Sequence, residues 1–409
     1  MAFSQPIPLS LYIHYPWCQQ KCPYCDFNSH TAQNVDDQES AYLAALIQQL
    51  EATLPWIWGR PIESIFIGGG TPSLISVNGL NQLLSALRAR LTWRPQTEIT
   101  LEANPGAMET QKFAEFAKAG INRLSLGAQS FDPAVLKRLG RIHTPQDTRD
   151  AMAAARAAGF QRINLDVMFA LPQQSLAQAQ ADIQAALALA PDHVSYYQLT
   201  LEPNTPFYRN PPSLPDEDQA WWMQQAGHDQ LQQAGFEQYE VSAFAKKAQA
   251  HDIDQHCRHN LNYWQYGDYV GLGAGAHGKL TRMDTGEVWR TQMPASPGGY
   301  VRVCQGLRPS SEGALPGRVT QVSASERVFE FMLNVLRLNQ GFDLALFQQR
   351  TGLSSERIRP ILADWISQDW LQVDAGPMCA ESATETETQA YVLTPLGQRY
   401  LNTVLSTLL

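Results

Sequence analysis

Hydrophobic positions in the first half of the chain alternate between short apolar runs and longer segments with helical spacing. The short runs predict six strands, and the longer segments predict six helices between them. We expect strands at residues 9–14, 63–67, 98–102, 122–126, 162–168 and 193–201, and helices at 38–53, 78–91, 110–119, 133–139, 145–158 and 175–189. Apolar strands that alternate with helices indicate a parallel sheet covered by helices. Six such units predict an α/β fold of the partial-barrel type, with functional residues at the carboxyl ends of the strands.

The second half of the chain predicts an edge to this sheet and then a smaller domain. A helix at 216–234 and a strand at 236–242 are expected to close the sheet edge, and residues 292–317 are rich in Gly, Pro and Ser. We therefore expect a first domain at 1–290, a linker at 291–316 and a mostly helical domain at 317–409. Its helices, from about residue 325, at 344–351 and at 354–368, precede a strand–loop–strand pattern that resembles a winged helix, with a Thr- and Glu-rich loop at 381–388.

Charge and hydropathy exclude several classes of protein. The net charge is -9, and residues 317–409 carry seven Arg and no Lys against ten Asp plus Glu, a net of -3. Because nucleic-acid affinity rests on basic side chains, we expect no nucleic-acid partner and a docking or lid role for the C-terminal domain. No run reaches the ~18 to 20 apolar residues of a membrane-spanning helix, and no signal peptide is apparent. These features predict a cytoplasmic protein without a membrane segment.

Three of the six cysteines fall within eight positions, directly after the first predicted strand: Cys18, Cys22 and Cys25. Too few cysteines are present for a disulfide scaffold, so this cluster predicts metal ligands. Thiolates are the ligands of iron–sulfur clusters, and three of them leave one iron of a [4Fe-4S] cluster open. The open iron offers a place for the amino and carboxylate groups of S-adenosylmethionine (SAM). A structural zinc site with His30 as fourth ligand is the alternative.

Polar and glycine residues gather at the ends of the following strands. A glycine-rich turn, Gly68 to Pro72, follows the second strand, where backbone without side chains can approach a ligand closely. Four polar residues lie at or just beyond later strand ends: Glu102, Gln129, Arg141 and Asp166. An unpaired polar group in an apolar strand is costly, so these residues predict either ligand contacts or an internal network of ion pairs and hydrogen bonds.

The motif Tyr12-x-His14-x-Pro16-Trp17-Cys18-x3-Cys22-x-Tyr24-Cys25-Asp26-Phe27 resembles the signature of the radical SAM superfamily, in its oxygen-independent coproporphyrinogen III oxidase-like branch. The resemblance runs over about residues 8 to 290 and returns in the tail. It implies a partial (β/α)6 radical SAM barrel with a [4Fe-4S] cluster on the three cysteines, SAM at the open iron, and cleavage of SAM to a deoxyadenosyl radical. The residues that fall on SAM contacts of the family are Tyr12, Tyr24, Gly69, Gly70, Thr71, Glu102, Gln129, Arg141, Asp166 and Thr200.

Two features separate the chain from the oxidases of that branch. Phe27 stands where those enzymes carry a further cysteine, and the first strand begins near residue 9 without their N-terminal extension. The segment His259-Asn260-x2-Tyr263-Trp264 resembles the HNxxYW segment of the HemW haem chaperones. This resemblance implies haem as cargo, a haem-accepting apoprotein and an electron donor protein, with a homodimer among the arrangements left open. Coproporphyrinogen III oxidation is the alternative function, so enzymatic activity also stays open.

The HNxxYW segment, residues 259–264, has two interpretations. His259 is of a type that binds haem iron, and Tyr263 and Trp264 are of types that stack on a flat macrocycle, so the three predict haem contacts. The alternative is a structural belt that packs the small domain onto the barrel. Other candidate haem contacts are His256, Cys257, His277 and Cys304.

Overall fold

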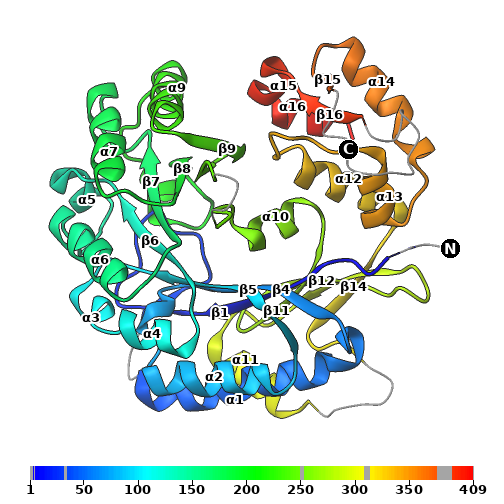
Figure 1. Ribbon diagram of the computed structural model, residues 1–409, viewed down its shortest axis with the longest axis horizontal. Coiled ribbons are helices and arrows are strands. Elements are labelled where there is room, and N and C mark those ends of the chain that lie inside the picture. Colours follow the sequence, from blue (N-terminus) through cyan, green and yellow to red (C-terminus); the bar gives the residue numbers. More distant parts are fainter. Residues whose placement is uncertain are drawn as a thin grey trace.

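The computed structural model describes residues 3, 5–31, 35–248, 253–307, 314–374 and 389–408. Within these ranges the main feature is a curved twelve-stranded sheet with strand order β14-β13-β12-β11-β1-β4-β5-β6-β7-β8-β10-β9. Helices cover its outer side, and a smaller C-terminal unit lies across the open side of the curve (Figure 1).

Six parallel strands form the centre of this sheet, as the sequence predicts. They are β1 (Leu9–Tyr15), β4 (Pro61–Gly69), β5 (Thr92–Ala103), β6 (Arg123–Gln129), β7 (Ile163–Phe169) and β8 (His193–Gln198). Their connections carry α1 (Val35–Ile57), α2 (Val77–Arg88), α3 (Ala107–Thr110), α4 (Phe113–Ala119), α5 (Pro133–Arg138), α6 (Pro145–Ala157) and α7 (Leu176–Ala188). Thr144 and Ser175 begin α6 and α7 with reciprocal capping boxes, which satisfy amide donors that a helix start leaves free. The partial (β/α)6 barrel is therefore confirmed.

Further strands extend both edges of the sheet. After α8 (Pro206–Arg209) and α9 (Glu217–Gln233), β9 (Phe236–Glu240) and β10 (Ala243–Lys246) close one edge in antiparallel fashion. The sequence predicts α9 and β9 but not β10, which pairs directly with β8. At the other edge β11 (Asp268–Leu272) pairs in parallel with β1. Three antiparallel strands continue from it: β12 (His277–Thr281), β13 (Val288–Gln292) and β14 (Arg318–Val322).

The stretch expected to be a linker contributes to this first unit. It contains α11 (Pro297–Gln305), which Ser296 caps and which packs against α1 through buried Tyr300 and Cys304. The glycine and proline that suggested a linker are the first helical residues, where proline is well tolerated. Strand β14, which the sequence assigned to the C-terminal domain, belongs to the large sheet.

The C-terminal unit has its own apolar core, formed by residues such as Phe331, Phe347 and Trp365. Its helical elements are α12 (Ala324–Val335), α13 (Leu344–Thr351), η2 (Ser355–Arg357), α14 (Arg359–Ser367), α15 (Pro395–Arg399) and α16 (Leu401–Ser406). Strands β15 (Leu371–Asp374) and β16 (Ala390–Leu393) pair as expected of a strand–loop–strand, whereas the loop predicted at Glu381 to Thr388 lies outside the described residues. In the described part of the chain, no helix has the length and apolar character needed to span a membrane.

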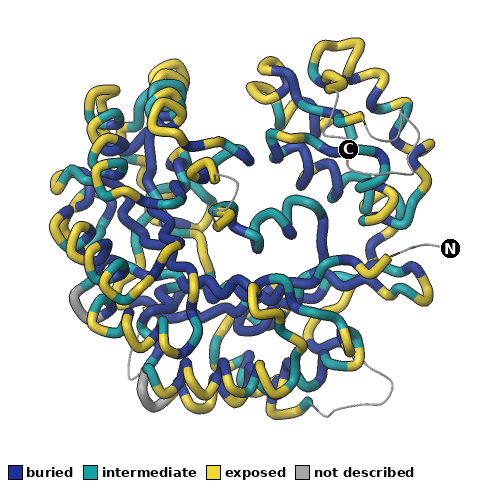
Figure 2. Tube along the Cα trace, viewed as in Figure 1, coloured by how far each residue is buried: buried dark blue, intermediate teal, exposed yellow. Residues whose placement is uncertain are grey.

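Both units have buried residues in their interiors (Figure 2). The short helix α10 (Arg258–Trp264) lies between the two units (Figure 1). It packs against β1, β4 and β11 on one side and α12 on the other. The HNxxYW segment therefore occupies the junction of the two units.

Candidate functional site

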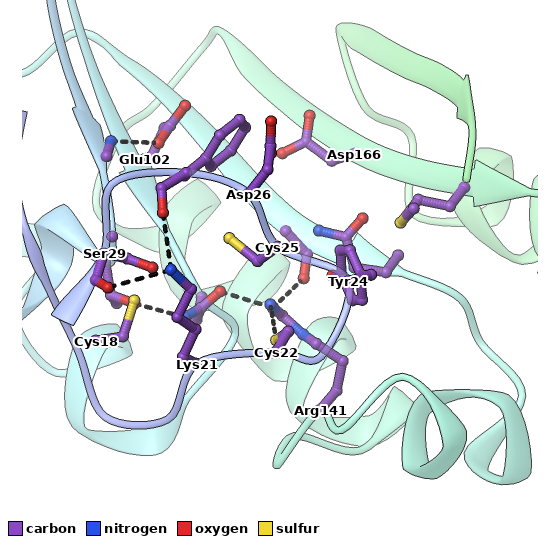
Figure 3. Close-up of a pocket in the computed structure, with 18 of the residues that line it drawn as sticks. Cys18, Lys21, Cys22, Tyr24, Cys25, Asp26, Ser29, Glu102, Arg141 and Asp166 are labelled. Carbon is purple, nitrogen blue, oxygen red and sulfur yellow. Dashed lines mark hydrogen bonds between the residues drawn. The ribbon is translucent and has the colours of Figure 1, made fainter. Parts of the chain in front are cut away.

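A single loop after β1 carries the three clustered cysteines. It includes the short parallel pair β2 (Trp17–Cys18) and β3 (His30–Thr31). Inside the loop, the Cys25 amide donates to the Cys22 carbonyl at 3.2 Å. The Lys21 ammonium donates to the carbonyls of Phe27 and Ser29 at 3.0 and 3.3 Å, which holds the loop closed. All three thiols line one pocket of about 400 Å³ at the carboxyl ends of the strands (Figure 3).

The glycine-rich end of β4 forms the wall next to Cys18. A Cβ atom on Gly70 would lie 2.6 Å from the Trp17 carbonyl oxygen and 3.0 Å from the Cys18 sulfur. Gly69 adopts a φ of +124°, which L side chains rarely tolerate. Glycine is therefore required at both positions for the strand end to reach the cysteine loop. Thr71 continues the wall, and η1 (Pro72–Leu74) follows it.

Two half-buried residues with carboxyl groups, Glu102 and Asp166, face the same pocket from β5 and β7 (Figure 3). Burial, with a further contribution from Asp166, raises the pKa of Glu102 to about 8, and the Gly69 amide opposes this by donating to Oε2 at 3.2 Å. Burial likewise raises the pKa of Asp166, although Asn164 donates to Oδ1 at 2.8 Å and Ser125 to Oδ2 at 3.3 Å. A cationic ligand would favour ionisation of both groups, so this wall suits an ammonium or sulfonium.

Arg141 crosses the pocket from the segment after α5. Its guanidinium donates to the Asn104 amide oxygen at 2.6 Å and to the Gly127 carbonyl at 2.8 Å, and it lies 3.8 Å from the Cys22 sulfur. Asn104 in turn donates to the Thr71 hydroxyl at 3.1 Å. The sequence analysis missed Asn104, although it stands two residues after Glu102, and alternation along an extended segment places such residues on one face.

Gln129 reaches the pocket through an unusual backbone. Its φ is +66°, and the register of β6 against β7 shifts just before it. The Tyr197 hydroxyl donates to its side-chain oxygen at 2.8 Å. Strain at a non-glycine residue persists only where its surroundings hold it, and it is common at functional sites. Tyr24 and Thr200 also line this pocket.

Tyr12 is the one predicted SAM contact that the structure does not bring to the pocket lining. Its hydroxyl lies 2.9 Å from His14 Nδ1, and its ring packs beside Phe66 with ring centroids 6.4 Å apart. Tyr12 lies within β1, and its contacts with His14 and with Phe66 of β4 hold its ring outside the pocket lining.

The donor set fits a [4Fe-4S] cluster with SAM beside it. Within the described ranges, no group of three His, Cys, Asp or Glu side chains is positioned to hold one metal ion, so the zinc tetrahedron with His30 is not assembled there. The three thiols instead spread around the pocket, as a cluster with a separate iron for each thiolate requires. Glu102, Asp166 and Arg141 have the charges that would complement the SAM sulfonium, amine and carboxylate.

The HNxxYW segment lies away from this pocket. His259 is buried, with Nδ1 at 3.1 Å from the Ser64 hydroxyl and its backbone amide donating to Glu98 at 3.2 Å. The Tyr263 carbonyl accepts a hydrogen bond from Asn334 of α12 at 2.9 Å. The Arg337 guanidinium lies over the Trp264 ring at 4.5 Å. These contacts favour the structural-belt interpretation of the segment.

The other candidate haem contacts are scattered. Cys257 and Cys304 are buried in separate places, and the Cys257 thiol donates to Glu98. His256 pairs with Asp254 at 2.5 Å, and His277 is exposed on β12. The structure therefore does not gather these four residues into one site.

Comparisons with known proteins agree with the fold. The sequence model of the Radical SAM superfamily matches residues 12–186, and that of the HemN C-terminal domain matches residues 322–382. Heme chaperone HemW of Escherichia coli is 45% identical over 364 residues, covering 89% of this chain and 92% of that protein. Heme chaperone HemW of Bacillus subtilis is 34% identical, covering 86% and 89%. Coproporphyrinogen III oxidase (HemN) of E. coli shares the fold, with a TM-score of 0.76 and 21% identity over 98% of this chain and 90% of that one.

A partial parallel barrel with a three-cysteine loop at the carboxyl ends of its strands, together with the superfamily match, defines a radical SAM protein. Within that superfamily, the sequence identity to HemW proteins, which extends over nearly the whole of both chains, determines the family. The chain belongs to the HemW heme chaperone family.

Proposed function

We propose that this protein holds a [4Fe-4S] cluster on Cys18, Cys22 and Cys25, binds SAM beside it, and carries haem to an acceptor protein. The observation that supports this best is the pocket, where three thiols on one loop share a cavity with two carboxyl groups and an arginine. Membership of the HemW heme chaperone family supports haem as the cargo.

The pocket residues have distinct parts in SAM binding. Glu102 and Asp166 become carboxylates that offset the positive charge of the sulfonium and the amine, and Arg141 pairs with the SAM carboxylate. Gly69 and Gly70 let the ligand approach the β4 backbone closely. When bound and reduced, the cluster supplies an electron to the sulfonium, so an electron donor protein is part of the proposal.

Phe27 supports a carrier over a coproporphyrinogen oxidase. It lines the pocket with a side chain that is 60% exposed, at the position where the oxidases of the resembled branch have a cysteine. An apolar ring there offers neither a thiol nor a charge to a substrate propionate. Decarboxylation of coproporphyrinogen III therefore lacks one of the groups associated with it.

The test is to reconstitute the protein anaerobically, titrate haem while following the Soret band, and measure transfer to an apoprotein. Coproporphyrinogen III conversion is assayed in parallel with SAM and reductant. We expect about one haem and about four iron per chain, and no decarboxylation. Cys22→Ala should lose the iron, whereas Cys304→Ala, outside the pocket, should keep it. Turnover of coproporphyrinogen III at ~1 per second would show that the protein is an oxidase and that the proposed carrier function is wrong.

A further inference from the structure

A second cavity, of about 830 Å³, lies between the barrel and the C-terminal unit. We call it the α9 groove. One side is α9, and the other is formed by residues 336–339 after α12 and by α15 and α16; these helices face each other across the open side of the molecule (Figure 1). Gln198, at the end of β8, lines both the α9 groove and the cysteine pocket, so the two cavities adjoin. Its volume is within the range of about 300 to 1,000 Å³ typical of small-molecule sites.

The α9 groove offers apolar surface to a flat ligand. Trp221 lines it from α9, with 36% of its side chain exposed, and Leu396, 41% exposed, lines it from α15. Leu336, Leu338 and Leu401 add further apolar area. Burial of a large aromatic macrocycle against such side chains makes the free energy of binding more favourable.

The charged residues of the α9 groove favour an anionic ligand. Its lining holds Arg337 and Arg399 against one carboxylate, Glu217, in a chain whose net charge is -9. Arg399 makes no ion pair with any described residue, and its guanidinium lies 5.3 Å from the centre of the Trp221 ring. The Arg337 guanidinium forms a long ion pair with Glu240, at 3.7 Å, and lies over the Trp264 ring at 4.5 Å. Guanidinium groups recognise carboxylates in bidentate fashion, so both arginines suit ligand propionates.

His228 adds a nitrogen without a partner. Its Nε2 is buried and accepts or donates no hydrogen bond among the described residues, and its ring packs 5.0 Å from that of Phe244. Burial lowers the pKa of His228 to about 4, so the imidazole is neutral at pH 7, which is its metal-binding form. A buried nitrogen without a partner costs free energy, and coordination to iron would provide the missing partner once neighbouring side chains shift to admit it.

We propose that the α9 groove is the haem site, with the macrocycle against Trp221 and the leucines, the propionates on Arg337 and Arg399, and the iron on His228. This inference rests on the proposed haem-carrier function. It assigns the cargo to a site separate from the HNxxYW segment, beside the SAM pocket.

The test compares haem with metal-free protoporphyrin IX, which has the same macrocycle and propionates but no iron. Arg399→Ala should weaken binding of both ligands about tenfold, the effect of losing one charged hydrogen bond. His228→Ala should shift the Soret band of the haem complex and weaken haem about tenfold, while protoporphyrin IX binds as in the wild type. Binding is measured by titration of the full-length, cluster-loaded protein.

Matched controls separate this site from the rest of the molecule. Arg357→Ala removes an exposed arginine of the same unit outside the groove, and His277→Ala removes an exposed histidine on β12; both should bind haem as the wild type does. Arg399 is exposed, so its variant tests the groove even if His228→Ala fails to fold. If both groove variants bind haem normally while His259→Ala does not, the α9 groove is not the haem site. If the wild type binds no haem, the carrier function itself is wrong.

Discussion

Glu102 lies in the cysteine pocket as a carboxyl group without an ion pair to any described residue. Its pKa is raised from 4.5 to about 8, so between these pH values the folded protein binds a proton that the unfolded chain releases. The stability of the ligand-free protein must then fall as pH rises through this window. In the ligand-free pocket the charged form of Glu102 is therefore unfavourable until a cation binds.

Glu102→Gln should separate stability from ligand binding. Because the amide stays neutral, the melting temperature of the ligand-free variant should exceed that of the wild type by about 2 °C or more at pH 8, and the difference should shrink at pH 5. SAM affinity should fall, since the carboxylate is lost. Differential scanning fluorimetry at the two pH values and SAM titration measure these effects. A variant that is less stable than the wild type at pH 8 would show that the Glu102 carboxylate stabilises the folded protein and is not held there for ligand binding.

Several residues of the site were predictable because they follow strand ends in the sequence. The three cysteines follow this rule after β1, since parallel strands gather their carboxyl ends at one edge, whereas Asp166 lies within β7, three residues before its end. Tyr12 departs from it, because the family motif does not show how deep in the barrel a mid-strand ring lies. The bend that brings Gln129 into the pocket depends on a φ of +66°, which no side-chain pattern reveals.

At the scale of elements, α10 connects the two units through side-chain and backbone contacts. Asn334 reaches the Tyr263 carbonyl, and Arg337 covers Trp264, whose indole nitrogen has no partner in the described part of the chain. The backbone carbonyl of Arg337 also accepts a hydrogen bond from the Val241 amide. The HNxxYW segment thus fixes the unit that forms one wall of the α9 groove.

Trp264→Ala should therefore act on stability more than on the ligand. Loss of the ring area and of the Arg337 contact should cost on the order of 2 kcal/mol in the free energy of unfolding. Haem affinity should change less than in Arg399→Ala. Trp58→Ala, whose side chain is 78% exposed, is the control and should leave stability unchanged. If the variant keeps wild-type stability but loses haem binding, Trp264 contacts the haem.

The elements of the barrel were predictable, and strands β11 to β14 beyond it were not. Apolar runs and capping residues such as Thr144 and Ser175 identify the six central units locally. Strands β11 to β14 have five residues each, and β11 pairs with a strand some 260 positions earlier, as Leu9 lies opposite Asp268. Short strands between glycines carry too little pattern to be assigned without their partners.

In the whole molecule, Tyr266 and Glu330 join the large sheet to the C-terminal unit. Tyr266, which follows α10, is completely buried within the C-terminal core, and its hydroxyl donates to Glu330 of α12 at 2.6 Å. Arg290 of β13 donates to both oxygens of Glu330 at 3.1 and 2.9 Å. Lys279 of β12 donates to the Tyr266 carbonyl at 3.0 Å. These bonds cross between units that otherwise have separate cores.

Glu330→Ala should loosen this junction without disturbing either core. It leaves the Arg290 guanidinium and the Tyr266 hydroxyl without their acceptor, which should cost about 1 to 3 kcal/mol. Hydrogen exchange should become faster in α12 and at the β13 edge, while amides of the cysteine pocket keep wild-type rates. Glu356→Ala is the control, because among the described residues this exposed carboxylate pairs only with Arg359, three residues later. If exchange in Glu330→Ala increases equally in the pocket and the junction, the two units unfold together, and the α9 groove between them cannot open on its own to take up or release a ligand.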